Sequence, residues 1–249
     1  MHLLPAGLPR PAVGAFTTRA GGTSAAPYDA LNLGMHVQDE WRRVHANREL
    51  LAEAAGLDRG ELVFAQQVHG AGVAVVDRAS SRGRNGGVAG VDALVTTTPG
   101  LGLVVLAADC LPVLLADPAA GVVAVAHAGR QGLVAGVLQA TLTAMAGLGA
   151  TVVGTTAVIG PAACGRCYEV PPEMATEVDA AVPGSRSTTR SGTASVDLTR
   201  GAVAVLTGAG LSEVRTAGGC TLEQPELLYS YRRDGRTGRH AGIAWMSGG

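Results

Sequence analysis

The chain has 249 residues, of which 47% are hydrophobic, so it is long enough to bury a sizeable core and is not dominantly disordered. Its 19 basic residues, all of them arginine, nearly balance 20 acidic residues for a formal net charge of -1. This balance argues against nucleic acid or an anionic membrane as a partner and favours a small, weakly charged substrate.

The amino-terminal segment does not have the features of a secretory signal. It contains Pro5, Pro9 and Pro11, lacks a basic start and has no unbroken apolar stretch. The longest apolar region, residues 101–126, is interrupted by charged residues and prolines, whereas a membrane-spanning helix needs roughly 18 to 20 uninterrupted apolar residues. We therefore expect a cytoplasmic protein whose four cysteines are reduced or metal-bound rather than paired in disulfides.

The first half of the chain predicts one helix followed by a group of strands. Apolar residues fall on one helical face between Gln38 and Gly56, with Asp39 as the expected cap and Gly56 as the end of the helix. Short aliphatic runs then predict strands at residues 62–64, 73–76, 93–96, 103–108, 112–116 and 122–127. The turn sequence at 117–121 predicts that the last two strands form a hairpin.

The second half mixes helices and strands. The pattern predicts helices at 131–148, directly after Pro171 and Pro172, and at 197–210, and strands at 151–159 and 241–246. Two segments rich in Gly, Ser and Arg, residues 80–90 and 184–195, are expected to be exposed loops. Because strands cluster and helices intervene irregularly, we predict an α+β fold: a single layered domain over residues 1–249, with mixed β-sheets flanked by helices.

Three candidate metal ligands lie at the ends of predicted strands: His69, Cys110 and His127. Two imidazoles and a thiolate suit zinc, and three protein ligands leave a fourth tetrahedral position for water or substrate. Their spacing matches no local zinc pattern, and on composition alone the favoured interpretation is that each is an ordinary core or surface residue. Strand ends bring side chains from different strands together, which favours the metal site.

Asp109 directly precedes Cys110 and has two candidate roles. It would orient a neighbouring imidazole as a hydrogen-bond acceptor, or act as a general acid or base. The alternative is a solvated carboxylate at a strand end.

Cys164 and Cys167 form a Cys-x-x-Cys motif. Its usual interpretations are half of a zinc site or a redox pair, but the sequence has no second such motif and no thioredoxin-type helix start after it. We therefore predict a buried or pocket-lining cysteine pair.

Several arginines are candidate anion ligands, because a guanidinium binds phosphate or carboxylate through two parallel hydrogen bonds. Arg19, followed by Gly21 and Gly22, is the first candidate for phosphate, and Arg232 and Arg239 come next. For any single arginine, plain solvent exposure is the competing interpretation.

Short motifs in a fixed order along nearly the whole chain resemble the YfiH/YlmD family, also described as laccase-domain, polyphenol oxidoreductase or peptidoglycan editing factor proteins. These motifs are Thr18-Arg19-Ala20-Gly21-Gly22, Leu31-Asn32-Leu33-Gly34, Asn47-Arg48, Gln67-Val68-His69-Gly70, Asp92-Ala93-Leu94-Val95-Thr96, Ala108-Asp109-Cys110-Leu111-Pro112-Val113, His127-Ala128-Gly129, Ile159-Gly160-Pro161, Cys167-Tyr168-Glu169-Val170, Cys220-Thr221, Tyr229-Ser230-Tyr231-Arg232-Arg233 and Thr237-Gly238-Arg239. Each motif alone is weak, but their order makes the set specific.

The resemblance implies a layered fold with mixed sheets and a metal, usually zinc, on His69, Cys110 and His127. It also implies phosphorolysis of adenosine, inosine and 5′-methylthioadenosine, with adenosine deamination as a side activity. The expected catalytic residues are Asp109, Cys110 and His127. The expected substrate or phosphate contacts are Arg19, Asn32, Gln67, Arg232 and Arg239.

In this hypothesis the partners are a purine nucleoside and phosphate, without nucleic acid or membrane, and the protein is a monomer or weak homodimer. One alternative is a cysteine hydrolase with Cys110 as nucleophile and His127 as base. Copper is the alternative metal, although one His–Cys–His set is too small for the several coppers of a laccase. The non-enzymatic alternative is an editing factor that recognises a peptidoglycan precursor.

Overall fold

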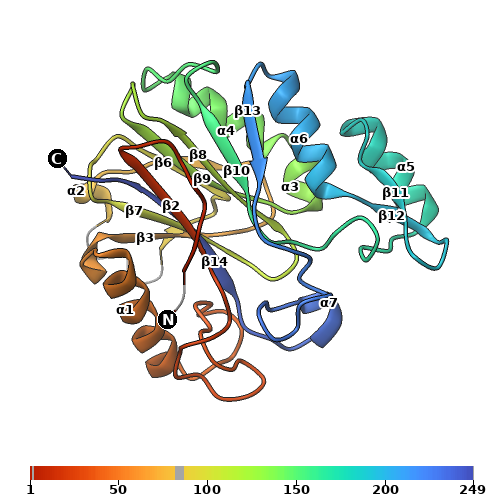
Figure 1. Ribbon diagram of the computed structural model, residues 1–249, viewed down its shortest axis with the longest axis horizontal. Helices are drawn as coiled ribbons and strands as arrows, with labels where there is room; N and C mark the ends of the chain where they lie inside the picture. Colours follow the sequence, from red (N-terminus) through yellow and green to blue (C-terminus); the bar gives the residue numbers. More distant parts are fainter. Residues whose placement is uncertain (2, 82–86, 249) are drawn as a thin grey trace.

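The computed structural model describes residues 1, 3–81 and 87–248 and is built on two six-stranded mixed sheets (Figure 1). Sheet 1 contains, from edge to edge, β1 (Leu3–Pro5), β2 (Ala12–Thr17), β14 (His240–Met246), β7 (Gly102–Ala107), β3 (Leu62–Gln66) and β5 (Val88–Ala89). Sheet 2 contains β13 (Glu213–Thr216), β10 (Thr156–Ile159), β8 (Leu111–Asp117), β9 (Val122–Ala128), β6 (Ala93–Thr96) and β4 (Val73–Val75).

Helices cover the outer faces of both sheets. The helix α1 (Trp41–Ala55) packs on sheet 1, at lower left in Figure 1. On the side of sheet 2 lie α3 (Arg130–Val134), α4 (Val137–Ala146), α5 (Pro172–Ala181) and α6 (Leu198–Gly208). The remaining elements are short: η1 (Arg59–Glu61), α2 (Arg78–Ser81), the hairpin of β11 (Arg186–Thr188) and β12 (Ala194–Val196), and α7 (Tyr231–Asp234).

Burial on both faces explains why the central strands are continuously apolar. Along β7, Leu103 and Val105 face the core between the two sheets, whereas Val104 and Leu106 face the cluster that includes Leu51 of α1. The same alternation runs along β8 and β9, with every other residue facing the helices. A strand with two buried faces carries an unbroken hydrophobic run. The layered fold with mixed sheets and flanking helices is therefore confirmed.

Most predicted elements are present, and the hairpin of β8 and β9 is confirmed by antiparallel pairing from Leu111 with Ala128 to Asp117 with Val122. The predicted helix at 131–148 was wrong as a single element. Gly136 has a φ of 86°, in the left-handed region, so the helix breaks between α3 and α4.

Three further expectations need correction. Only 156–159 of the predicted strand 151–159 is extended, because Asp117 accepts hydrogen bonds from Thr151 and holds the preceding residues in a turn. Asp39 does not cap α1; its carboxylate accepts instead from Ser24 and Asn32. The segment 184–195 contains β11 and the start of β12 rather than only a loop. Within the predicted loop 80–90, residues 82–86 lie outside the described residues.

The chain also contains strands that its sequence pattern did not predict. The strand β2 follows a proline-rich start, yet it pairs with β14 from Ala12 with Met246 to Phe16 with Gly242.

Among the described residues, no helix combines the length and apolar character needed to cross a membrane.

His240, at the start of β14, is fully buried in the core. Burial, reinforced by nearby Arg239, lowers the pKa of His240 from 6.5 to about 4, although the Pro161 backbone acts in the opposite direction. The unfolded chain therefore binds a proton below pH 6.5 that the folded protein does not accept until about pH 4.

We expect this difference to destabilise the protein as the pH falls through that window. His240 alone should lower the free energy of unfolding by about 2–3 kcal/mol between pH 7 and pH 4.5. Urea unfolding of the wild type and of His240→Leu at both pH values measures this effect. Equal losses in the two proteins would contradict the assignment, because leucine does not titrate.

Candidate active site

The three candidate ligands converge where sheet 1 passes into sheet 2. His69 follows the end of β3, Cys110 lies in the short connection between β7 and β8, and His127 is the penultimate residue of β9. Their ligand atoms all lie within 4.8 Å of one another. The rings of His69 and His127 meet edge to face, with centroids 4.9 Å apart. We call these residues the His–Cys–His cluster.

A buried carboxylate, Asp92, orients both histidines. Its Oδ1 accepts from Nδ1 of His127 at 2.8 Å and from the backbone N–H of His69 at 2.9 Å. Its Oδ2 accepts from the N–H groups of Gly70 and Val68 at 2.7 and 3.2 Å. Asp109 was one candidate for orienting an imidazole, but in the structure this contact is made by Asp92, which precedes β6.

Opposite charges stabilise one another inside the cluster. Burial opposes ionisation of Cys110, but hydrogen bonds and positive charge from His127 and His69 lower its pKa to about 6. For His127, burial likewise favours the neutral ring, but hydrogen bonds with Asp92 and Cys110 raise its pKa. The lowered pKa of Cys110 favours its thiolate at neutral pH, and the thiolate is the form that binds metals.

The donor set fits a catalytic metal site. Two imidazoles and one thiolate are suitable zinc ligands, and the cluster faces a cavity that can hold a fourth ligand. The bond from Nδ1 of His127 to Asp92 leaves its Nε2 for the metal, as in the carboxylate–histidine pairs of zinc sites.

Gly129, at the end of the His-Ala-Gly motif, lies so close to the cluster that no side chain fits. A Cβ there would meet Sγ of Cys110 at 2.8 Å and Cδ2 of His69 at 3.1 Å. We expect Gly129→Ala to displace both ligands and to weaken metal binding by about 10–100-fold, the usual cost of disturbing the support of metal ligands. Competition with a chromogenic chelator measures this, with Gly208→Ala as control because its Cβ would meet nothing within 4 Å. Unchanged affinity in Gly129→Ala would contradict the close approach.

A cavity of about 830 Å³ opens in front of the cluster. This is the size of a typical small-molecule site, and its wall combines apolar and aromatic side chains with a few polar groups. The residues that bear on its chemistry are His36, Arg48, Gln67, His69, Asp109, Cys110, His127, Tyr168, Tyr231, Arg232 and Arg239.

Asp109 occupies the cavity wall in a strained conformation, with a φ of 110°. Its Oδ1 accepts from the hydroxyl of Thr221 at 2.5 Å, and its Oδ2 accepts from the backbone N–H of Arg232 at 2.7 Å. These two contacts hold the carboxylate in place beside Cys110, so its remaining lone pairs face a defined direction.

The structure brings three of the five predicted substrate contacts to the cavity. Arg232 stacks on Tyr168, with 5.0 Å from its guanidinium carbon to the ring centroid, and Arg239 lies over Tyr231 at 5.8 Å. Gln67 also lines the cavity, but its amide bonds the backbone of Leu106 at 2.6 and 2.9 Å and joins β3 to β7.

The other two predicted contacts, Arg19 and Asn32, are not among the described residues that line the cavity. The guanidinium of Arg19 donates to Asp29 and to the carbonyl of Pro225. Asn32 is fully buried, and its Oδ1 accepts from the backbone N–H of Arg239 at 2.9 Å. Asn32 therefore supports a cavity residue from behind.

Sequence reasoning missed two basic residues of the cavity, Arg48 and His36. Arg48 is 6% exposed, and its guanidinium carbon lies 3.7 Å from the centroid of the Phe64 ring. Its Nε and Nη2 donate to the carbonyl of Leu33. Burial, and secondarily Arg59, lowers the pKa of Arg48 to about 10, so it remains cationic at neutral pH. Burial and then Arg239 lower the pKa of His36. Arg48 falls on the same face of α1 as the buried residues Val44 and Leu51, and a charged residue on that apolar face was the available signal.

The fold and the site define an α/β protein with two mixed sheets and a His–Cys–His cluster on the wall of a cavity. A family model described as multi-copper polyphenol oxidoreductase laccase matches residues 13–247. The chain belongs to this family, which includes the YfiH and YlmD proteins.

Solved structures of relatives share the architecture. A Neisseria meningitidis protein superposes with a TM-score of 0.88 at 35% identity over 100% of both chains. YlmD from Geobacillus stearothermophilus superposes with a TM-score of 0.89 at 30% identity, over 96% of this chain and 93% of that chain.

Curated relatives carry the name purine nucleoside phosphorylase. One from Streptomyces griseus is 54% identical over 93% of both chains. Another, from Deinococcus radiodurans, is 44% identical over 90% of this chain and 85% of its own length.

Proposed function

We propose that the protein is a zinc-dependent purine nucleoside phosphorylase acting on adenosine, inosine and 5′-methylthioadenosine, with adenosine deamination as a side activity. The observation that carries this proposal is the convergence of the His–Cys–His cluster, Asp109 and several arginines on one cavity. The names of the relatives support the same reaction class.

Zinc held by His69, Cys110 and His127 would supply Lewis acidity at the cavity wall. Asp109 would exchange a proton with the purine ring, since it lies next to Cys110 and is held by Thr221 and Arg232. In phosphorolysis the bond from ribose C1′ to the purine nitrogen breaks, a bond from C1′ to a phosphate oxygen forms, and the purine leaves with a proton.

Phosphate and base would bind to different parts of the cavity. The buried Arg48 and the half-buried Arg239 would supply positive charge for phosphate, a role expected first for Arg19. Tyr168 and Tyr231 offer aromatic faces on which a purine ring can stack. Arg232 stacks on Tyr168 and donates from Nη1 to the carbonyl of Glu169 at 2.9 Å, so it orders that tyrosine.

The experiment that tests this function is purine release from inosine, adenosine and 5′-methylthioadenosine, each with and without inorganic phosphate. We expect release to require phosphate and to yield ribose 1-phosphate or its methylthio analogue. Release at the same rate without phosphate, with free ribose as product, would overturn phosphorolysis in favour of hydrolysis.

A cysteine hydrolase is the second candidate, because the lowered pKa of Cys110 and its neighbour His127 are also what a thiol nucleophile needs. The two candidates differ in their need for metal. Activity that survives complete chelation and is lost on alkylation of Cys110 would favour the hydrolase, whereas loss on chelation and recovery with zinc would favour the phosphorylase.

A further inference from the structure

A second group of metal-binding side chains lies outside the cavity, built from two turns of the same form. In the first turn, Cys164 and Cys167 are three residues apart, and the carbonyl of Cys164 accepts from the N–H groups of Cys167 and Tyr168. In the second, Cys220 and Glu223 are three residues apart, and the carbonyl of Cys220 accepts from the N–H of Glu223 at 3.2 Å. Each turn thus presents two donor groups on one side.

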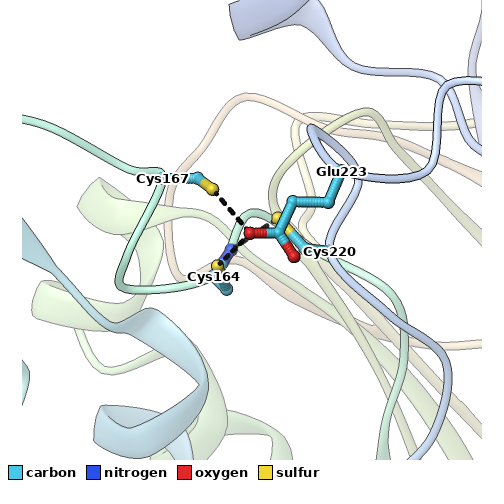
Figure 2. Close-up of side chains that lie close together, drawn as sticks. All are labelled: Cys164, Cys167, Cys220 and Glu223. Atoms are coloured by element: carbon cyan, nitrogen blue, oxygen red, sulfur yellow. Dashed lines mark hydrogen bonds between the residues drawn. The ribbon is translucent and has the colours of Figure 1, made fainter. Parts of the chain in front are cut away.

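The backbone holds the two turns against each other. Ala162 and Cys220 form a parallel β-bridge, with the N–H of Ala162 bonded to Gly219 and that of Thr221 bonded to Ala162. Figure 2 shows the result: the side chains of Cys164, Cys167, Cys220 and Glu223 point toward one common centre. We call these four residues the cysteine cluster.

The distances within the cysteine cluster suit a tetrahedral ion. With Zn–S bonds of about 2.3 Å and a Zn–O bond of about 2.0 Å, tetrahedral ligand atoms lie roughly 3.5–3.8 Å apart. Here Oε1 of Glu223 lies 3.2 Å from Sγ of Cys167 and 4.0 Å from Sγ of Cys164, and all four ligand atoms lie within 4.8 Å of one another.

Neighbouring groups support two of the four donors, Cys220 and Glu223, as they do in metal sites. The backbone N–H of Cys164 donates to Sγ of Cys220 at 3.4 Å, and Arg190 forms an ion pair with Glu223. Such contacts orient ligands and stabilise their anionic forms. A smaller cavity of about 370 Å³, lined in part by Cys164 and Cys220, gives an ion a route to the cluster.

We propose that Cys164, Cys167, Cys220 and Glu223 form a second, structural site for a zinc-like divalent cation, separate from the His–Cys–His cluster. Four protein donors would complete the tetrahedron, which is the mark of a structural rather than a catalytic zinc site. A disulfide is the competing state, but any pairing among three thiols leaves the third cysteine and the carboxylate unexplained.

The bound ion would stabilise the positions of residues in the active-site cavity. Thr221, next to Cys220, donates to Asp109, and Tyr168, next to Cys167, lies under Arg232. A metal ion in the cysteine cluster would therefore link two segments, 164–168 and 220–223. Each segment positions a part of the cavity wall. This inference does not depend on the identity of the reaction.

Metal counting on purified protein, loaded with zinc and passed through a desalting column, tests the proposal. We expect two zinc ions per chain in the wild type and one in Cys110→Ala. The exposed residue Glu223 allows a mild variant: Glu223→Gln should fold and should bind the second zinc about 100-fold more weakly, a loss at the upper end of that caused by disturbing ligand support. Glu226→Gln, an exposed carboxylate in the same segment, is the matched control and should keep both ions.

Cobalt substitution distinguishes the two sites by their thiolate content. In Cys110→Ala, cobalt should retain strong thiolate-to-metal absorption, and adding Cys164→Ser with Cys167→Ser should abolish it. The proposal is overturned if the wild type binds one zinc and Glu223→Gln leaves that number and its affinity unchanged. It is also overturned if intact mass shows a disulfide among these cysteines in freshly purified protein.

Discussion

Cys110→Ala is expected to lower kcat/KM for phosphorolysis by about 10³-fold, or about 4 kcal/mol of transition-state stabilisation, while the protein remains folded. The side chain supplies the only sulfur of the His–Cys–His cluster, and its removal leaves two imidazoles to hold the ion. The cost to folding should be small, because Cys110 lies in a connection between strands and its neighbours Leu111 and Val113 carry the packing. Steady-state kinetics with inosine and thermal unfolding of the same preparation measure both effects.

Cys110→Ser and metal content complete this experiment. Serine keeps the size of the side chain but is a poor zinc ligand, so it should lose zinc and activity together. A Cys110→Ala protein that is folded, has lost the zinc of the His–Cys–His cluster and still phosphorolyses inosine at the wild-type rate would refute the metal-dependent mechanism. A variant that unfolds would instead make the zinc at this cluster structural.

Asp92→Asn is expected to have the second largest effect, because one buried carboxylate holds both histidines. An amide keeps the shape but offers one acceptor atom and places N–H donors against the N–H groups of Gly70 or His69. We expect zinc affinity to fall by about 10–100-fold, and the free energy of unfolding to fall by about 3 kcal/mol. Chelator competition and urea unfolding measure the two losses.

Asp117→Asn is the matched control. Asp117 is also buried, at 2% exposed, and accepts from the backbone N–H groups of Ala119, Ala120 and Thr151, but it ends β8 at the hairpin turn and does not lie at the cluster. It should lose stability and keep its zinc affinity. If both variants keep wild-type zinc affinity, Asp92 does not position the ligands.

Much of the fold can be predicted from the sequence, because local burial leaves a local pattern. Strands buried on two faces read as unbroken aliphatic runs, as in β7, β8 and β9, and α1 ends at Gly56 with the left-handed φ of 68° that glycine allows. The ordered motifs also indicated the family. Elements without such patterns were missed, among them β2, whose hydrogen-bond partner β14 lies more than 200 residues away.

The contacts between polar groups depend on the three-dimensional fold and cannot be predicted from local sequence. His127 and Asp92 are 35 residues apart and Cys164 and Cys220 are 56 apart, so no local spacing reveals either contact. The second half of the cysteine cluster was visible as Cys220-x-x-Glu223, but a carboxylate in place of a fourth cysteine does not stand out in a sequence. A Gly-rich neighbourhood predicts anion binding by Arg19, whereas the fold places Asp29 against its guanidinium. Local patterns record burial, whereas a site depends on which strand ends and turns the sheets bring together.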